Sequence, residues 1–176
     1  MLKRVMIVLL ASTVWMASTQ SRATDTVELT PDNVVTVWQN INEVILVLSA
    51  SIALDDEWID GLRDLQPSTT LDTAKMPSEM NIFHEKLNAI LNSSDLKTLD
   101  RLPHGDDLST PALYVNSGIL LDHLLHYLIA SDSLASVSIY YGEGEDTTHG
   151  MSDQDVVAQI NLANQRLDAF IEENGL

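Results

Sequence analysis

The sequence predicts an all-α fold: a four-helix bundle built from a duplicated helix–long connection–helix unit, with short extra helices in the connections. Three observations predict it. Four stretches carry apolar residues in steps of three and four, which mark one face of an α-helix. Glycine and proline are sparse, 7 and 5 in 176 residues, and this favours helices over a turn-rich β fold. The chain has no cysteine, so packing rather than disulfide bonds must hold it together.

The four helices are predicted over residues 31–50, 77–92, 111–130 and 153–173. Their first residues, counted as zero, are Pro31, Pro77, Pro111 and Asp153. Each stretch places apolar residues at +3, +10 and +14. Thr30, Thr110 and Ser152 precede three of the starts and are predicted N-caps, whose hydroxyl groups accept a hydrogen bond from an unpaired amide. Proline is tolerated at the first helical position because its missing N–H would have no partner there.

The spacing of these starts predicts the duplication. They lie 46, 34 and 42 residues apart, so a long connection separates the first helix from the second and the third from the fourth. Connections in helical bundles usually have about 2–8 residues, and longer ones are expected to carry structure of their own. We predict a short helix over residues 54–66 and one or two further turns over residues 93–101.

A cleaved secretion signal is expected at residues 1–23. A short basic region with Lys3 and Arg4 precedes an apolar run over residues 5–16. The small residues leading to Ala23 then match the cleavage rule for signal peptides. The apolar run is shorter than the roughly 20 residues of a spanning helix, although an uncleaved N-terminal anchor is the alternative. We expect a soluble periplasmic protein with no integral membrane segment after cleavage.

Residues 24–176 are expected to form a single, strongly acidic domain. Cleavage removes three basic residues and no acidic one, so the formal charge changes from 9 − 26 = −17 to 6 − 26 = −20. Such a charge repels phosphate groups and anionic lipids, which argues against nucleic-acid and membrane partners. A protein partner or a small ligand remains as the expected partner.

The most specific pattern lies at position +11 of the four helices, where a short amide or carboxylate recurs. The four residues are Asn42, Asn88, Asp122 and Asn164. Asparagine is a mediocre helix former, so something other than helix propensity must place it there. These side chains either bond neighbouring helices and connections and so fix the helix register, or form a polar ring that binds a small ligand or cation. Inheritance from the duplication, without a present role, is a third interpretation.

A histidine pair is the candidate metal site. His123 and His126 lie at i and i+3 on one helix, beside Asp122. Two imidazoles in this arrangement can share a divalent metal such as Zn²⁺ or Cu²⁺. His104, in the preceding loop, is a further candidate ligand. The signal is weaker than the HExxH motif, which has a defined catalytic base, and no other cofactor is expected.

No catalytic motif is found, since the chain lacks a GxSxG elbow, a P-loop and a GxGxxG sequence. We therefore name no catalytic residue and do not favour an enzyme. The leading hypothesis is a non-catalytic, exported periplasmic helical bundle that acts through protein–protein interaction or as an accessory subunit. The alternative is a periplasmic sensor or carrier of a metal ion or small ligand.

Overall fold

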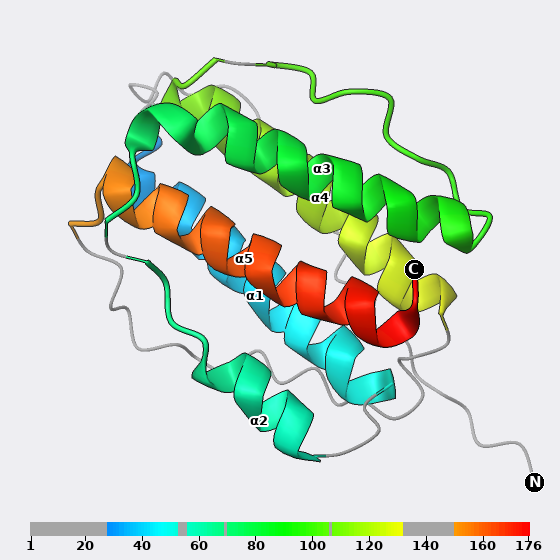
Figure 1. Ribbon diagram of the computed structural model, residues 1–176. Helices are drawn as coiled ribbons and strands as arrows, with labels where there is room; N and C mark the ends of the chain where they lie inside the picture. Colours follow the sequence, from blue (N-terminus) through cyan, green and yellow to red (C-terminus); the bar gives the residue numbers. More distant parts are fainter. Residues whose placement is uncertain (1–27, 53–55, 69, 106, 132–149) are drawn as a thin grey trace, which may run out of the picture.

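The computed structural model describes residues 28–52, 56–68, 70–105, 107–131 and 150–176 (Figure 1). These residues form helices and no strand, so the all-α prediction is confirmed. The elements are α1 (Pro31–Ile52), α2 (Asp56–Asp64), the 3₁₀ turn η1 (Thr73–Lys75), α3 (Met76–Ser93), α4 (Thr110–Ala130) and α5 (Asp153–Asn174). The short helix predicted over residues 54–66 is α2. The expected signal peptide lies outside the described residues.

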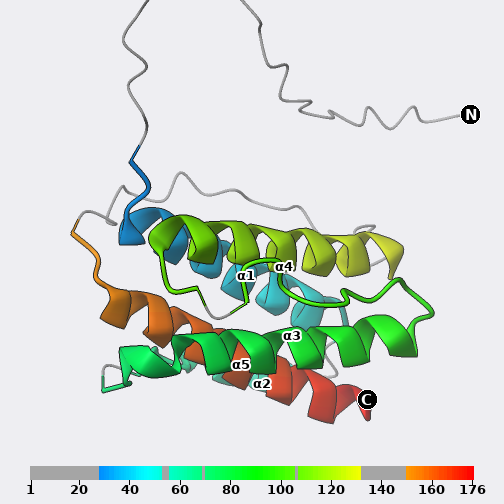
Figure 2. The ribbon, with the colours of Figure 1, turned by 90° about the horizontal axis from the view of Figure 1, so that it is seen from above.

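The four long helices α1, α3, α4 and α5 all run in the same direction (Figures 1 and 2). At one end of the molecule, the amide of Met151 donates to Asp32 Oδ1 over 2.7 Å, which joins the starts of α5 and α1. At the other end, the rings of Tyr127 and Phe170 meet edge to face, 6.3 Å apart, near the ends of α4 and α5. A helix of 21 residues is about 31 Å long. The chain must cover that distance before each new long helix begins, which takes at least about 9 extended residues.

The core lies among these four helices. α1 packs closely against α4 and α5, and α3 packs against α5, whereas α3 and α4 make less contact. Trp38 of α1 meets Phe83 of α3 edge to face at the centre, with ring centroids 5.2 Å apart. The largest fully buried side chains are Trp38, Phe83, Phe170, Ile41, Ile45, Leu48, Met76, Leu87, Ile90, Leu91, Leu120 and Leu124.

The connection over residues 94–109 runs between α3 and α4 in the view of Figure 2. Its described residues, 94–105 and 107–109, carry no helix, so the helical turns predicted over residues 93–101 are wrong. Leu102 is buried with 5% of its surface exposed, and Leu96 and Leu99 pack against the same core. These three leucines lie three residues apart, which resembles a helical pattern. Side chains of α3 and α4 bond the backbone of this segment instead, as described below, and hold it in a non-helical course.

The predicted register is right in α1, α3 and α5, where positions +3, +10 and +14 are all buried. It is wrong by one residue in α4, where the predicted core residue Tyr114 is 37% exposed. This helix begins at Thr110 with Ser109 as its N-cap, so Thr110 is not the cap. Counting from Thr110 restores the pattern and makes Leu113, Leu120 and Leu124 the buried residues. The error arose because α4 is apolar on nearly every side, so periodicity does not single out its inner face.

The starts of α1 and α5 are capped by local hydrogen bonds. Ser152 Oγ and its backbone N–H donate to Asp155 Oδ2 over 2.7 and 2.8 Å, as in a capping box. These bonds lower the pKa of the Asp155 carboxyl group, because they favour its charged form. At the start of α1, the N–H of Thr30 donates to Asn33 Oδ1 over 2.9 Å.

Over Pro31–Ser51, α1 is long and apolar enough to cross a membrane by length and composition. In the folded chain, 44% of that stretch is buried. Val34, Trp38, Ile41 and Ile45 are fully enclosed in the core. Packing against α4 and α5 therefore accounts for the apolar composition of this helix.

Candidate functional site

Two of the predicted +11 side chains join the long helices to one another. Asn42 of α1 is 2% exposed, and its Nδ2 donates to the backbone oxygen of Gln159 in α5 over 3.2 Å. Asn164 of α5 is 4% exposed, and its Nδ2 donates to the backbone oxygen of Glu79 in α3 over 2.9 Å. Each amide thus bonds a backbone group on a neighbouring helix. These bonds fix the position of the two helices relative to each other along the helix axis.

Asn88 of α3 bonds the 94–109 connection instead. Its Nδ2 donates to the backbone oxygen of Leu99 over 2.8 Å, and its Oδ1 accepts from the N–H of Leu99 over 2.9 Å. His84 Nε2 lies 2.8 Å from the same carbonyl oxygen. The same nitrogen lies 3.0 Å from Asn88 Nδ2. Two side chains of α3 therefore hold one peptide of the connection.

Asp122 differs from the other three, because it is exposed on the outside of α4. The one-residue shift in register explains its position. The residue that bonds the connection from α4 is Asn116, which is 1% exposed and accepts the N–H of His104 through Oδ1 over 3.3 Å. The three +11 asparagines thus bond separate partners rather than one another, and a ligand-binding role for the four +11 residues stays a prediction.

The histidines of the candidate metal site lie in two different segments. His123 is half-buried, and its Nδ1 donates to the backbone oxygen of Ile119 over 2.9 Å. His126 on α4 and His104 in the 94–109 connection are exposed. Within the described part of the chain, no group of three or more histidine, aspartate or glutamate side chains is placed to hold a metal ion. Binding of Zn²⁺ or Cu²⁺ by these residues stays a prediction.

A buried arginine was missed in the sequence. Arg166 of α5 is 6% exposed, and its Nε donates to the backbone oxygen of Leu62 in α2 over 3.2 Å. Its Nη1 donates to Asn42 Oδ1 over 3.3 Å. Burial lowers the pKa of the guanidinium group, and the charge of Glu43 partly offsets this effect. The Leu62 carbonyl belongs to the last turn of α2, where helix carbonyls lack partners, so Arg166 attaches α2 to α5 and α1.

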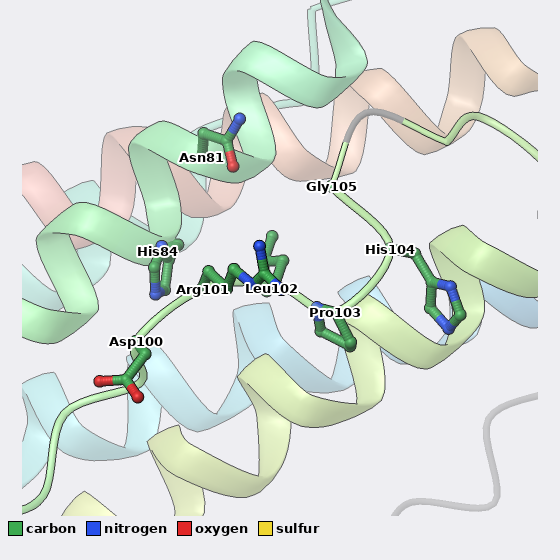
Figure 3. Close-up of a pocket in the computed structure, with 8 residues that line it drawn as sticks. All are labelled: Asn81, His84, Asp100, Arg101, Leu102, Pro103, His104 and Gly105. Atoms are coloured by element: carbon green, nitrogen blue, oxygen red, sulfur yellow. The ribbon is translucent and has the colours of Figure 1, made fainter.

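An open groove of about 540 Å³ lies between α3 and the 94–109 connection. Figure 3 shows Asn81 and His84 on the helix side, and Asp100, Arg101 and His104 along the connection. Leu102 and Pro103 form part of its lining. The lining residues include imidazole, guanidinium and carboxylate groups, and nothing in the +11 pattern predicted the groove.

The outer surface of α4 is the most apolar exposed feature of the described residues. The side chains that share this face are Pro111, Tyr114, Val115, Gly118, Asp122, His126 and Ile129, all exposed. Apart from the adjacent pair Tyr114 and Val115, they follow one another in steps of three or four and form one stripe. We call this stripe the α4 outer face. Tyr114, Val115 and Ile129 have 37%, 41% and 61% of their surfaces exposed.

No protein-family model matches this chain, and no curated protein or solved structure matches it.

Proposed function

We propose that this chain is an exported periplasmic, non-catalytic helical protein that binds a protein partner, or serves as an accessory subunit, through the α4 outer face. One observation carries the proposal. The described residues contain six exposed large apolar side chains, and four of them lie on α4 or two residues before it. Those four are Leu108, Tyr114, Val115 and Ile129. They gather on one helix, with the exposed polar residues Asp122 and His126 between Val115 and Ile129, and apolar surface gathered on one element favours an interaction site.

The polar side chains of the interior support a non-catalytic role. The buried amides Asn42 and Asn164 bond backbone groups of neighbouring helices, and Arg166 bonds α2 and α1. The bonds that these side chains donate join helices, and none of the three side chains lines the groove between α3 and the 94–109 connection. A protein surface is then the feature of this molecule best suited to recognition.

Partner capture tests the proposal. A tagged chain is incubated with the extracytoplasmic extract of its source cells, alongside the double variant Val115→Ser/Ile129→Ser. Ile82→Ser is the matched control, since Ile82 lies on α3 and is 40% exposed, close to the 41% of Val115. We expect the wild type and the control to retain one partner that the double variant loses. Equal retention by all three chains, or a lone monomer in every case, would contradict the proposal.

At the level of the fold, we propose a four-helix bundle in which α1 with α3 and α4 with α5 are two copies of one unit. The common direction of the helices and the shared buried positions support this. In an experimental structure, the two pairs should superpose with their buried positions matched. Two unrelated helix arrangements would contradict the duplication.

Small-ligand or metal binding is a second proposal, favoured by the groove that His84, Asp100 and His104 help to line. Calorimetry with Zn²⁺ and Cu²⁺ on the wild type, on His104→Ala and on His123→Ala/His126→Ala tests it. A binding heat that one of these variants abolishes would support the proposal. Identical traces for all three proteins would exclude these histidines as ligands.

A further inference from the structure

We infer that the partner of the α4 outer face is an amphipathic helix of a cationic protein, which lays its apolar side along Tyr114, Val115 and Ile129. The inference rests on the proposed function and adds the chemistry of the partner. Two observations beyond exposure carry it: the distribution of charge around the face, and the glycine at its centre.

The α4 outer face carries one formally charged residue, the carboxylate Asp122, and no lysine or arginine. α1 and α4 pack side by side, and neither contains lysine or arginine. Their charged residues are Asp32, Glu43 and Asp122, all carboxylates. The basic residues of the described chain lie on other elements: Arg63, Lys75, Lys86, Lys97, Arg101 and Arg166.

This distribution favours a cationic partner over a second copy of the chain. The whole chain has a formal charge of −17, so a positively charged protein is attracted toward it over a distance of about 10 Å at moderate salt. A second copy would bring the same net negative charge and, on the same face, another carboxylate at Asp122. Like charges brought together in this way disfavour association.

The centre of the α4 outer face is shaped for close approach. Gly118 lies at the middle of α4, and a Cβ atom added there would meet no atom within 4 Å. The packing of the chain itself therefore does not require glycine, which destabilises a helix interior relative to alanine. A helix laid over this position can come closer to the backbone of α4 than it could over a larger side chain.

The size of the face suits one helix. From Pro111 to Ile129 it extends along about 27 Å of helix axis, the length of roughly 18 residues. Helix-on-helix recognition of this type uses apolar anchors at i, i+3, i+4 and i+7. A contact of this extent is at the small end of specific interfaces, so we expect an affinity in the micromolar range.

The test uses a labelled 18-residue peptide of leucine and lysine, with the leucines on one helical face. A scrambled isomer of the same composition and an analogue with glutamate in place of lysine serve as peptide controls. Binding is measured by fluorescence anisotropy at two salt concentrations. We expect the leucine–lysine peptide to bind, the two controls to bind at least tenfold more weakly, and added salt to weaken the complex.

Charge variants at one position locate the site. Both Val115→Glu and Val115→Lys remove an apolar contact, but only lysine also repels a cationic peptide. We expect a loss of about fivefold for Val115→Glu and more than tenfold for Val115→Lys. Ile82→Lys introduces the same charge on α3 and is expected to change the affinity less than twofold. Thermal unfolding of each variant verifies that it is folded.

Four results would overturn the inference. Equal binding of the scrambled peptide, or equal losses for Val115→Lys and Ile82→Lys, would show general charge attraction only. A dimer in sedimentation equilibrium that Val115→Glu abolishes would place a second copy on the face. Failure of the peptide to bind, while partner capture still depends on Val115 and Ile129, would refute the cationic helix and leave the proposed function standing. If capture also ignores these residues, both proposals fail.

Discussion

Replacement of Arg166 tests how α2 is attached to the rest of the molecule. The guanidinium group donates to the Leu62 carbonyl over 3.2 Å and to Asn42 Oδ1 over 3.3 Å. Both distances exceed the 2.7–2.9 Å of strong charge-assisted bonds, so we take the low end of their range, about 1.5 kcal/mol each. Arg166→Ala removes both bonds and leaves two buried acceptors without a donor. We expect it to lower the free energy of unfolding by about 3 kcal/mol.

Arg166→Met distinguishes the effect of the lost hydrogen bonds from the effect of the lost side-chain volume. Methionine fills much of the same volume and removes the penalty for burying a charge, which is large for an ion without a carboxylate in contact. We expect Arg166→Met to lower the free energy of unfolding by about 1 kcal/mol, clearly less than alanine does. Arg63→Met is the control, because Arg63 is 58% exposed and pairs only with Asp60 on the same helix. Its expected effect is below about 0.5 kcal/mol.

Urea unfolding gives these free energies by linear extrapolation, and amide hydrogen exchange gives their location. Loss of the Arg166 bonds is expected to raise exchange first in α2, residues 56–64, because it frees a carbonyl group of that helix. A change below about 1 kcal/mol for Arg166→Ala, or unchanged exchange in α2, would refute the idea that the arginine attaches this helix.

Three further predictions concern single sites. Asn88→Ala should lower the free energy of unfolding by about 1–2 kcal/mol and raise amide exchange in the 94–109 connection. Asp122→Ala, on the exposed side of α4, should change the free energy of unfolding by less than about 0.5 kcal/mol. Equal effects of the two substitutions would contradict the assigned roles. The pKa of Asp155 is lowered by its bonds from Ser152, so its contribution to stability is present above the unfolded pKa of about 3.9 and is lost as the pH falls through the lower folded value. Asp155→Asn should therefore flatten the acid limb of stability against pH, and an unchanged limb would show that other carboxyl groups control it. Gly61→Ala in α2 should stabilise the fold by about 0.5–1 kcal/mol, because an added Cβ meets nothing within 4 Å, and a loss of stability on urea unfolding would contradict this.

The sequence predicted the helices well because each has a start signal, and α1, α3 and α5 also have a one-sided apolar pattern. It failed in α4, where proline was taken as the first residue. α1 and α5 begin directly after Thr30 and Ser152, and α4 likewise begins directly after Ser109. Counting from the residue after the N-cap would have placed Leu113 in the core and Tyr114 outside it. In a helix that is apolar on most sides, the position of the N-cap indicates which residues face the core better than the periodicity does.

The burial of Arg166 could have been predicted from its place at position +13 of the fourth predicted helix. In the other three predicted helices this position is apolar, with Val44, Ile90 and Leu124, because it adjoins the core positions +10 and +14. An arginine there is either buried with partners or evidence of a wrong register. The groove and the partners of Asn88 could not be predicted in this way, since both depend on the path of the 94–109 connection. No local pattern specifies that an extended segment with Leu96, Leu99 and Leu102 will lie between two helices.

The parallel course of the long helices has a consequence for how the chain reaches its fold. Residues joined by the hydrogen bond between Met151 and Asp32 are 119 positions apart in sequence, and α1 has α4 and α5 as its closest neighbours rather than the next long helix along the chain. Interfaces formed over such separations slow folding, because loop closure must precede the contacts that reward it. The apolar side of α1 is covered completely only after α5 has been synthesised, because α1 packs against α5 as well as α4. This delay suits a chain that is expected to be exported before it folds.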